Sequence, residues 1–165
     1  MKSRKKRGIA LTSAAVLGIL FAFAGTCSFS IWKAQGDSMA PAIQKGERVW
    51  INKLAYLFGK PQQGELVAFH CDVYSEDGEG STLIKRVAAT EGDSVEIKDG
   101  TFYVNGRVYN EFAAELVYME PMEEVTVKEG EVFVLSDDRS AALDSRDSAV
   151  GTLKISELTG KVCFK

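Results

Sequence analysis

Residues 94–109 read SVEIKDGTFYVNGRVY. Two turn dipeptides, Asp99-Gly100 and Asn105-Gly106, separate short runs in which apolar and polar residues alternate. Asp-Gly and Asn-Gly tolerate the positive φ of two-residue hairpin turns, and alternation is typical of a strand with one buried face. The stretch therefore predicts two successive β-hairpins with tight turns.

Short apolar runs of strand length occur on both sides of this stretch, at residues 49–51, 66–69, 125–127, 132–135 and 158–164. Several follow a glycine-containing turn, which is the usual order of turn and strand. Helical periodicity is absent beyond the N-terminal segment, apart from a short turn around residues 39–44. The expected fold class is mainly β, and the polar, glycine-rich residues 73–81 are expected to form a surface loop.

The chain has 165 residues, enough for one compact domain, and its charge is unevenly distributed. Residues 1–32 carry five basic groups and no acidic group, so residues 33–165 hold the remaining 15 basic and all 23 acidic groups, a net charge of −8. An acidic domain of this kind has no basic face for phosphates, so we expect no nucleic-acid partner.

Histidine and cysteine are scarce. The single histidine, His70, excludes a His-rich metal site and would have to be the base of any Ser-His-Asp triad. Cys27, Cys71 and Cys163 are too few for a disulfide scaffold or a four-cysteine zinc site. The composition therefore excludes His-rich and four-cysteine metal sites.

Residues 8–32 contain no charge, and five basic residues precede them. A helix that crosses a bilayer needs about 20 apolar residues, and basic residues favour the cytoplasmic side. The pattern predicts a cytoplasmic tail at residues 1–7, a membrane anchor at 8–32 and an extracytoplasmic domain at 33–165. The alternative is a signal peptide cleaved after Ala22-Phe23-Ala24, and both interpretations export the acidic domain.

A serine lies in a sharp turn shortly after this segment, in Gly36-Asp37-Ser38-Met39-Ala40-Pro41. A glycine on one side and a proline on the other can direct both the serine Oγ and its backbone N–H toward one point. An ordinary Gly-Ser-Pro loop is the alternative interpretation.

Two adjacent cations, Lys85 and Arg86, lie in the apolar run 83–88. Side chains alternate between the faces of a strand, so the two point to opposite, otherwise apolar faces, and we expect one of them in the interior. Burial lowers the pKa of a lysine, and a neutral lysine can take a proton from a serine, which arginine cannot do. The alternative is a strand lysine whose amine reaches solvent.

Residues 136–151 are rich in Asp, Arg and Ser and follow a predicted strand. A solvated charged loop and a structured loop held by Asp–Arg pairs are both compatible with this composition. The spacing does not match an EF-hand calcium loop.

Taken in order, these blocks resemble the type I signal peptidases, most closely the small bacterial form with one membrane span. The resemblance runs from the N-terminal segment through Gly-x-Ser-Met-x-Pro, Gly-Glu-x-Val and Ile-Lys-Arg-Val to Asp-Asp-Arg-x₄-Asp-Ser-Arg. It implies a signal-peptidase-like fold of coiled antiparallel β-sheets with one N-terminal transmembrane helix. Residues 94–131 stand where larger relatives carry a cap domain. The resemblance also favours an uncleaved anchor over a cleaved signal peptide.

The resemblance implies a catalytic dyad with Ser38 as nucleophile and Lys85 as general base. The Ser38 N–H would hold the oxyanion in the turn formed by Gly36, Ser38 and Met39. Some family members place a second donor, a serine, at the position that is Gly36 here. The resemblance implies no cofactor.

The acidic loop of the family braces the lysine strand, which assigns a supporting role to six residues: Arg86, Asp137, Arg139, Asp144, Ser145 and Arg146. By position, Asp137 pairs with Arg86 and Asp144 pairs with Arg146. A family serine that touches the lysine falls on Ala142, so that contact is expected to be absent. Ser136 and Ala42 are further departures, replacing the usual Gly and Thr.

The substrate implied is an extended segment of an exported precursor, added as a strand beside the Lys85 strand. Its small residues would fill shallow pockets lined by Met39, Ile43, Leu83 and Ile84. The bilayer is the second expected partner, and the apolar run 54–58 is expected either to insert beside the active site or to join the core.

Two further functions remain open alongside a general signal peptidase. The departures at Ala42, Ser136 and Ala142 leave room for a Ser-Lys peptidase with a narrow client, such as a pilin or conjugation-related precursor. A non-catalytic surface assembly factor with the same fold is the other alternative.

Overall fold

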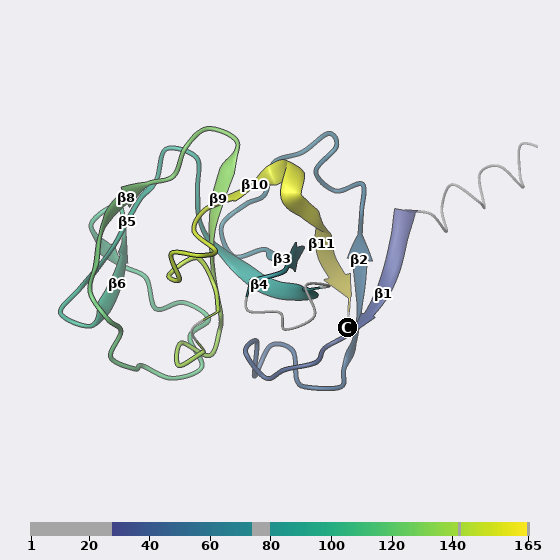
Figure 1. Cartoon of the computed structure of the whole chain (residues 1–165), viewed down its shortest axis with the longest axis horizontal. Helices are drawn as coiled ribbons and strands as arrows, with labels where there is room; N and C mark the ends of the chain where they lie inside the picture. The colour runs from purple at the N-terminus through teal and green to yellow at the C-terminus, as the bar shows by residue number, and fades with distance from the viewer. Residues whose placement is uncertain (1–27, 74–79, 142, 165) are drawn as a thin grey trace, which may run out of the picture.

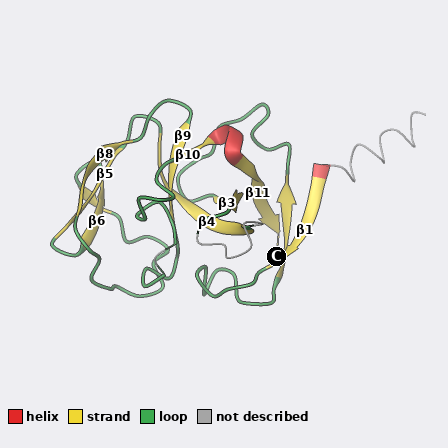
Figure 2. Cartoon of the chain, in the orientation of Figure 1, coloured by secondary structure: helices red, strands yellow, loops and turns green. Residues whose placement is uncertain are grey.

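The computed structural model describes residues 28–73, 80–141 and 143–164. In this part of the chain nearly all regular structure is strand, arranged in two antiparallel sheets (Figures 1 and 2). The expected mainly β class is confirmed. Most of the predicted membrane anchor and residues 74–79 of the predicted surface loop lie outside the described residues.

The larger sheet has seven strands in the order β1-β2-β11-β3-β4-β9-β10. Their bounds are β1 Phe29–Lys33, β2 Arg48–Asn52, β3 Leu66–Cys71, β4 Ser81–Thr90, β9 Glu131–Leu135, β10 Leu153–Lys154 and β11 Leu158–Phe164. A short 3₁₀-helix, Ile155–Glu157, leads into β11. Strand β4 lies between β3 and β9 and carries both Lys85 and Arg86.

The smaller sheet has the order β7-β6-β5-β8, with β5 Ser94–Lys98, β6 Thr101–Val104, β7 Arg107–Val108 and β8 Met122–Thr126. Asp99 and Gly100 have φ of 50° and 74°, and Asn105 and Gly106 have φ of 52° and 70°. Positive φ at both central residues is the requirement of the hairpin turn that matches strand twist. The two predicted hairpins are thereby confirmed.

The smaller sheet shares a core with the larger one. Val95 and Phe102 pack in one buried cluster with Ala89 and Phe133 of the larger sheet. The rings of Phe102 and Phe133 stack with centroids 5.6 Å apart. Burial of this shared apolar surface joins the two sheets, so residues 94–126 are an integral layer of the domain beside β4 and β9 (Figure 1).

The structure changes the expectation for the end of the N-terminal apolar segment. Residues 29–32 form most of β1, which pairs with β2 so that Ile31 lies opposite Trp50. The strand was missed because an uncharged run hides the alternation between exposed Phe29 and Ile31 and half-buried Ser30 and Trp32. Residues 8–28 are still 21 residues long, enough for a bilayer span. No helix in the described ranges has the length and hydropathy to cross a membrane.

Candidate active site

Ser38 lies in the turn that connects β1 to β2. The turn is held by backbone hydrogen bonds from Ala40 N–H to the Asp37 carbonyl and from Ile43 N–H to the Met39 carbonyl, each 2.8 Å long. Met39 and Ile43 are buried in the same cluster as Ile84 of β4. The apolar side chains of the turn therefore pin it to the sheet, while Ser38 itself stays partly exposed.

Lys85 is buried in β4, with 2% of its surface exposed. Its Nζ lies 3.0 Å from Ser38 Oγ, although the two residues are 47 positions apart. Burial lowers the pKa of the Lys85 ammonium; the nearby Asp144 carboxylate opposes this shift and Arg146 reinforces it. No carboxylate of the described residues forms an ion pair with Lys85. The amine therefore lies beside a serine hydroxyl in surroundings that favour its neutral form.

Arg86 is also buried, so the structure places both cations of β4 in the interior rather than the one expected. Asp137 makes this possible, because its two carboxylate oxygens accept hydrogen bonds from Arg86 Nε at 2.7 Å and Nη2 at 2.6 Å. The Gly64 carbonyl accepts a third from Nη1, and the guanidinium lies 4.1 Å from the ring centroid of Phe112. This bidentate pair links β4 to the loop that begins after β9.

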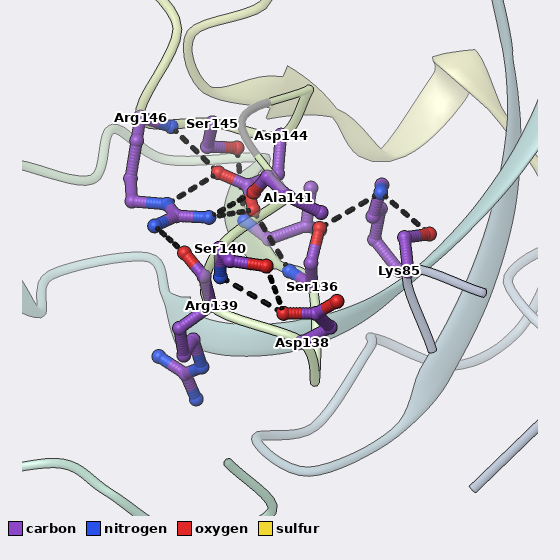
Figure 3. Close-up of polar contacts among 11 residues, drawn as sticks. Lys85, Ser136, Asp138, Arg139, Ser140, Ala141, Asp144, Ser145 and Arg146 are labelled. Carbon is purple, nitrogen blue, oxygen red and sulfur yellow. Dashed lines mark hydrogen bonds and ion pairs between the residues drawn. The ribbon is translucent and has the colours of Figure 1, made fainter. Parts of the chain in front are cut away.

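The loop after β9 is organised around the buried carboxylate of Asp144 (Figure 3). Asp144 Oδ1 and Oδ2 accept hydrogen bonds from Arg146 Nε at 2.8 Å and Nη2 at 2.7 Å, and Oδ2 also accepts one from the Ser136 N–H at 2.9 Å. Ser145 Oγ accepts a hydrogen bond from the Val134 N–H in β9. The loop is therefore a braced structure rather than a freely solvated one.

Arg139 has a different environment from the other supporting residues. Its guanidinium leaves the loop and lies 5.7 Å from the ring centroid of Tyr109, and its Nη2 donates a hydrogen bond of 3.3 Å to the Glu111 carbonyl. Its own carbonyl accepts a hydrogen bond from Arg146 Nη1 at 2.8 Å. Arg139 thus connects the loop to the segment after β7.

Two contacts of Ser38 and Lys85 were missed by the sequence analysis. Ser136 Oγ lies 2.8 Å from Lys85 Nζ (Figure 3), and the Asp138 N–H donates a hydrogen bond of 3.0 Å to the Ser38 carbonyl. In the sequence analysis a contact to Lys85 was considered only from position 142, and the structure shows one from Ser136 instead. Ala142 lies outside the described residues. No local pattern could reveal the contact, since it depends on the register of β4 against β9.

A cavity of about 110 Å³ adjoins Ser38. Gly36 lines it beside the Ser38 turn, and residues 81–84 line it from β4. The four predicted pocket residues all border it: Met39, Ile43, Leu83 and Ile84. Pockets for drug-sized ligands measure about 300–1,000 Å³, so this one accommodates only small groups.

The edge of β4 beside this cavity is unpaired among the described residues. Strand β3 pairs with residues 81–86 of β4, whereas β9 pairs only from Arg86 to Thr90. Backbone groups of residues 81–85 that face away from β3 are therefore available to an added strand. In the described ranges no three His, Cys, Asp or Glu residues are grouped as a metal site.

Comparison with known proteins places this geometry in a family. A family model described as "Signal peptidase, peptidase S26" matches residues 7–165. The chain is 39% identical over 135 residues to thylakoidal processing peptidase 1 of Arabidopsis thaliana, a match that covers 78% of this chain and 39% of that protein. A second thylakoidal relative, probable thylakoidal processing peptidase 2 of the same plant, is covered to 35%, so the chain spans well under half the length of both.

Bacterial relatives are matched over more of their length. Signal peptidase IB of Staphylococcus aureus is 29% identical over 174 residues, covering 94% of this chain and 86% of that protein. The crystal structure of a signal peptidase I from Enterococcus faecalis V583 is 27% identical, with a TM-score of 0.49, and covers 64% of this chain and 98% of that one. Because the family model matches almost the whole sequence, the chain belongs to the signal peptidase family, peptidase S26.

Proposed function

We propose that this chain is a membrane-bound serine endopeptidase that removes N-terminal signal peptides from exported precursor proteins. The observation that carries the proposal is the 3.0 Å separation of Lys85 Nζ and Ser38 Oγ in a chain of this family. Ser38 is the nucleophile and Lys85 the general base.

The chemistry follows from the state of the lysine. The lone pair of neutral Lys85 accepts the Ser38 proton as Oγ attacks the scissile carbonyl. The resulting ammonium then gives a proton to the leaving amine, which breaks the peptide bond and leaves an acyl-enzyme. That leaving amine is the new N-terminus of the mature protein, which departs at this stage. Neutral Lys85 next takes a proton from water, whose attack on the acyl-enzyme releases the signal peptide, and Lys85 passes that proton to Ser38 Oγ. The proton that Ser38 gives up leaves with the amine and water supplies its replacement, so the cycle closes without a cofactor.

The oxyanion is held by the backbone N–H of Ser38. This N–H donates to no protein acceptor recorded among the described residues, and the turn around it is braced by Met39 and Ile43. A preorganised donor of this kind stabilises negative charge that develops only during the reaction. At Gly36, two residues earlier, there is no side chain to supply a second donor.

The precursor binds as an extended segment along the unpaired edge of residues 81–85. Main-chain hydrogen bonds to this edge provide affinity for many sequences, and the small cavity next to Ser38 selects small side chains near the cleavage site. Because affinity comes from main-chain hydrogen bonds and selectivity from the small cavity, one site can accept many precursors that share only small residues at the cleavage site.

The domain contacts the bilayer beside its anchor, which we place within residues 8–28 with residues 1–7 in the cytoplasm. Ile31, Trp50 and Phe164 are cross-strand neighbours on one exposed face of β1, β2 and β11. Phe58 is 97% exposed and Leu57 65% exposed in the turn after β2. Apolar surface of this extent is typical of interaction sites, and its start directly after the apolar segment favours lipid as the partner.

The test is cleavage of a signal-peptide-bearing precursor by the full-length protein in detergent, followed by mass spectrometry of the new N-terminus. The wild type is expected to release the mature protein, and Ser38→Ala and Lys85→Ala are expected to release none while melting cooperatively. Normal processing by either variant would overturn the proposal. A panel that includes a pilin-type precursor separates a general enzyme from one with a narrow client.

A further inference from the structure

We propose that Ser136 is a positioning residue of the dyad, whose hydroxyl fixes the orientation of the Lys85 amine toward Ser38. This role rests on the proposed function, because it assumes that Lys85 is the base. It assigns to a loop residue of this chain the task of aiming the lone pair that receives the serine proton.

The contact is short and shielded from water. Ser136 Oγ lies 2.8 Å from Lys85 Nζ, and Ser136 has no exposed surface. Its backbone N–H donates to Asp144 Oδ2, and Asp144, which is equally buried, is held in turn by Arg146. The backbone of Ser136 is therefore fixed, and rotation about χ1 is the main motion left to its hydroxyl.

The geometry of a neutral amine explains why such a partner matters. Its nitrogen carries one carbon, two hydrogens and one lone pair in a roughly tetrahedral arrangement. When Ser136 Oγ accepts one N–H, rotation about the Cε–Nζ bond is restricted, and the lone pair can point at Ser38 Oγ, 3.0 Å away. Without that acceptor the amino group samples orientations in which an N–H, rather than the lone pair, faces the nucleophile.

The two residues that follow Ser136 also hold the groups around Lys85 and Ser38 in place. In three consecutive residues, Ser136 contacts Lys85, Asp137 pairs with Arg86, and the Asp138 N–H bonds to the Ser38 carbonyl. One short segment therefore contacts the base, the strand that carries it and the turn that carries the nucleophile. A loop that only filled space would not need a polar contact at each of these points.

The discriminating variants are Ser136→Ala, which removes the hydroxyl, and Ser136→Cys, which keeps a side chain of similar size but is a weak hydrogen-bond acceptor. For both we expect kcat to fall about 10- to 100-fold with little change in KM, because orientation matters to the chemical step and not to substrate binding. Ser148→Ala, an exposed serine in the same loop, is the matched control and should behave as the wild type.

The pH profile separates positioning from simple packing. The Ser136 hydroxyl accepts a hydrogen bond from the ammonium form of Lys85, so its removal should lower the pKa of Lys85 further. The acidic limb of kcat against pH should then move to lower pH in Ser136→Ala and Ser136→Cys. A loosened loop that let water reach Lys85 would instead relieve the burial that lowers its pKa and move the limb to higher pH.

The experiment uses the full-length protein in detergent with one precursor, and measures kcat, KM, the pH profile and the melting temperature of each variant. A wild-type kcat and an unmoved acidic limb in Ser136→Cys would overturn the role of Ser136. Wild-type activity in Ser38→Ala would overturn the proposed function itself, so the two failures are distinct. If Ser136→Ala does not fold, Ser136→Cys alone decides.

Discussion

Strand β4 has two halves with different surroundings. Residues 81–85 pair with β3, and their other edge lies unpaired beside the small cavity among the described residues. Residues 86–90 pair with β9, and their other edge is closed near its start by hydrogen bonds between Val87 and the backbone of Gly64 and Glu65. The half with an accessible edge is where the proposed chemistry and substrate binding lie.

The two cations at the junction show the same contrast. Lys85 has a hydroxyl on each side, Ser38 and Ser136, whereas Arg86 has the carboxylate of Asp137. Burial beside neutral hydroxyls lowers the pKa of Lys85, whereas the charge of the buried Arg86 guanidinium is balanced by the carboxylate of Asp137. Neighbouring positions of one strand thus carry the proposed base and a structural ion pair, and the partner of each cation distinguishes them.

The largest expected effect comes from exchanging the two cations. Lys85→Arg cannot deprotonate, so we expect the cleavage rate to fall by about 10²–10⁴-fold, the usual contribution of a general base. Arg86→Lys keeps a charge opposite Asp137 but loses the bidentate geometry and the hydrogen bond to Gly64, so it should lose stability and retain most of its activity per folded molecule. Precursor cleavage by the purified variants measures both rates. Equal losses of rate would show that Lys85 and Arg86 do not have different roles.

Removal of the ion pair between Asp137 and Arg86 should lower the free energy of unfolding and leave the chemical step largely unchanged. Asp137→Ala leaves Arg86 buried without its carboxylate, and removing one partner of a buried pair typically costs about 3–5 kcal/mol. Urea unfolding gives the change in the free energy of unfolding. Lys60→Ala, which breaks the exposed pair with Glu91, is the matched control and should change it little. An unchanged free energy of unfolding in Asp137→Ala would mean that the ion pair does not stabilise the fold.

The pH dependence of stability should report the state of Lys85. Its pKa is lowered in the folded protein, so between that value and the unfolded value near 10.4 the native state holds fewer protons than the unfolded state. The free energy of unfolding contributed by Lys85 then rises with pH in this window and is constant below it.

This contribution is measured as the difference between the wild type and Lys85→Met, which has no proton to lose. The stability of the wild type relative to Lys85→Met should increase as the pH rises, and cleavage by the wild type should rise over the lower part of the same range. A constant difference across the window would show that Lys85 keeps its ordinary pKa and would count against its role as a base.

Much of the fold could be predicted from local sequence signals. The hairpins of residues 94–109 follow from two dipeptides that accept positive φ, and the observed angles at Asp99 and Asn105 agree. Strand β1 could not be recognised, because Phe29 and Ile31 are as apolar as the segment before them. Alternation is informative only where one face is polar.

The candidate site likewise has residues that the sequence predicted and a contact that it did not. The order of motifs pointed to Ser38 and Lys85, and the pairing of Asp137 with Arg86 followed from the resemblance. The contact between Ser136 and Lys85 spans 51 residues and depends on where β9 ends beside β4, which is a property of the sheet rather than of either motif. Sequence reasoning identified Ser136 only as a replacement of the usual Gly. A position in a motif identifies a residue but does not show which side chain it contacts.

The smallest expected effect tests the cavity on the accessible side of β4. Gly36 lines this cavity opposite residues 81–84, and a Cβ at that position would meet no atom within 4 Å. The Cβ of Gly36→Ser therefore fits without a clash, and its hydroxyl stands two residues before the proposed nucleophile. Because loss of a preorganised oxyanion donor costs about 10²–10³-fold, a new but mobile donor should raise kcat by roughly 3- to 10-fold.

The matched control is Gly36→Ala, which introduces the same Cβ without the hydroxyl. It should leave kcat at the wild-type value, so that any gain in Gly36→Ser is assigned to hydrogen bonding rather than to a stiffer turn. Equal gains in both variants would indicate that the backbone of the turn, and not the number of donors, limits the reaction. No gain in Gly36→Ser would show that a hydroxyl at position 36 does not reach the developing oxyanion.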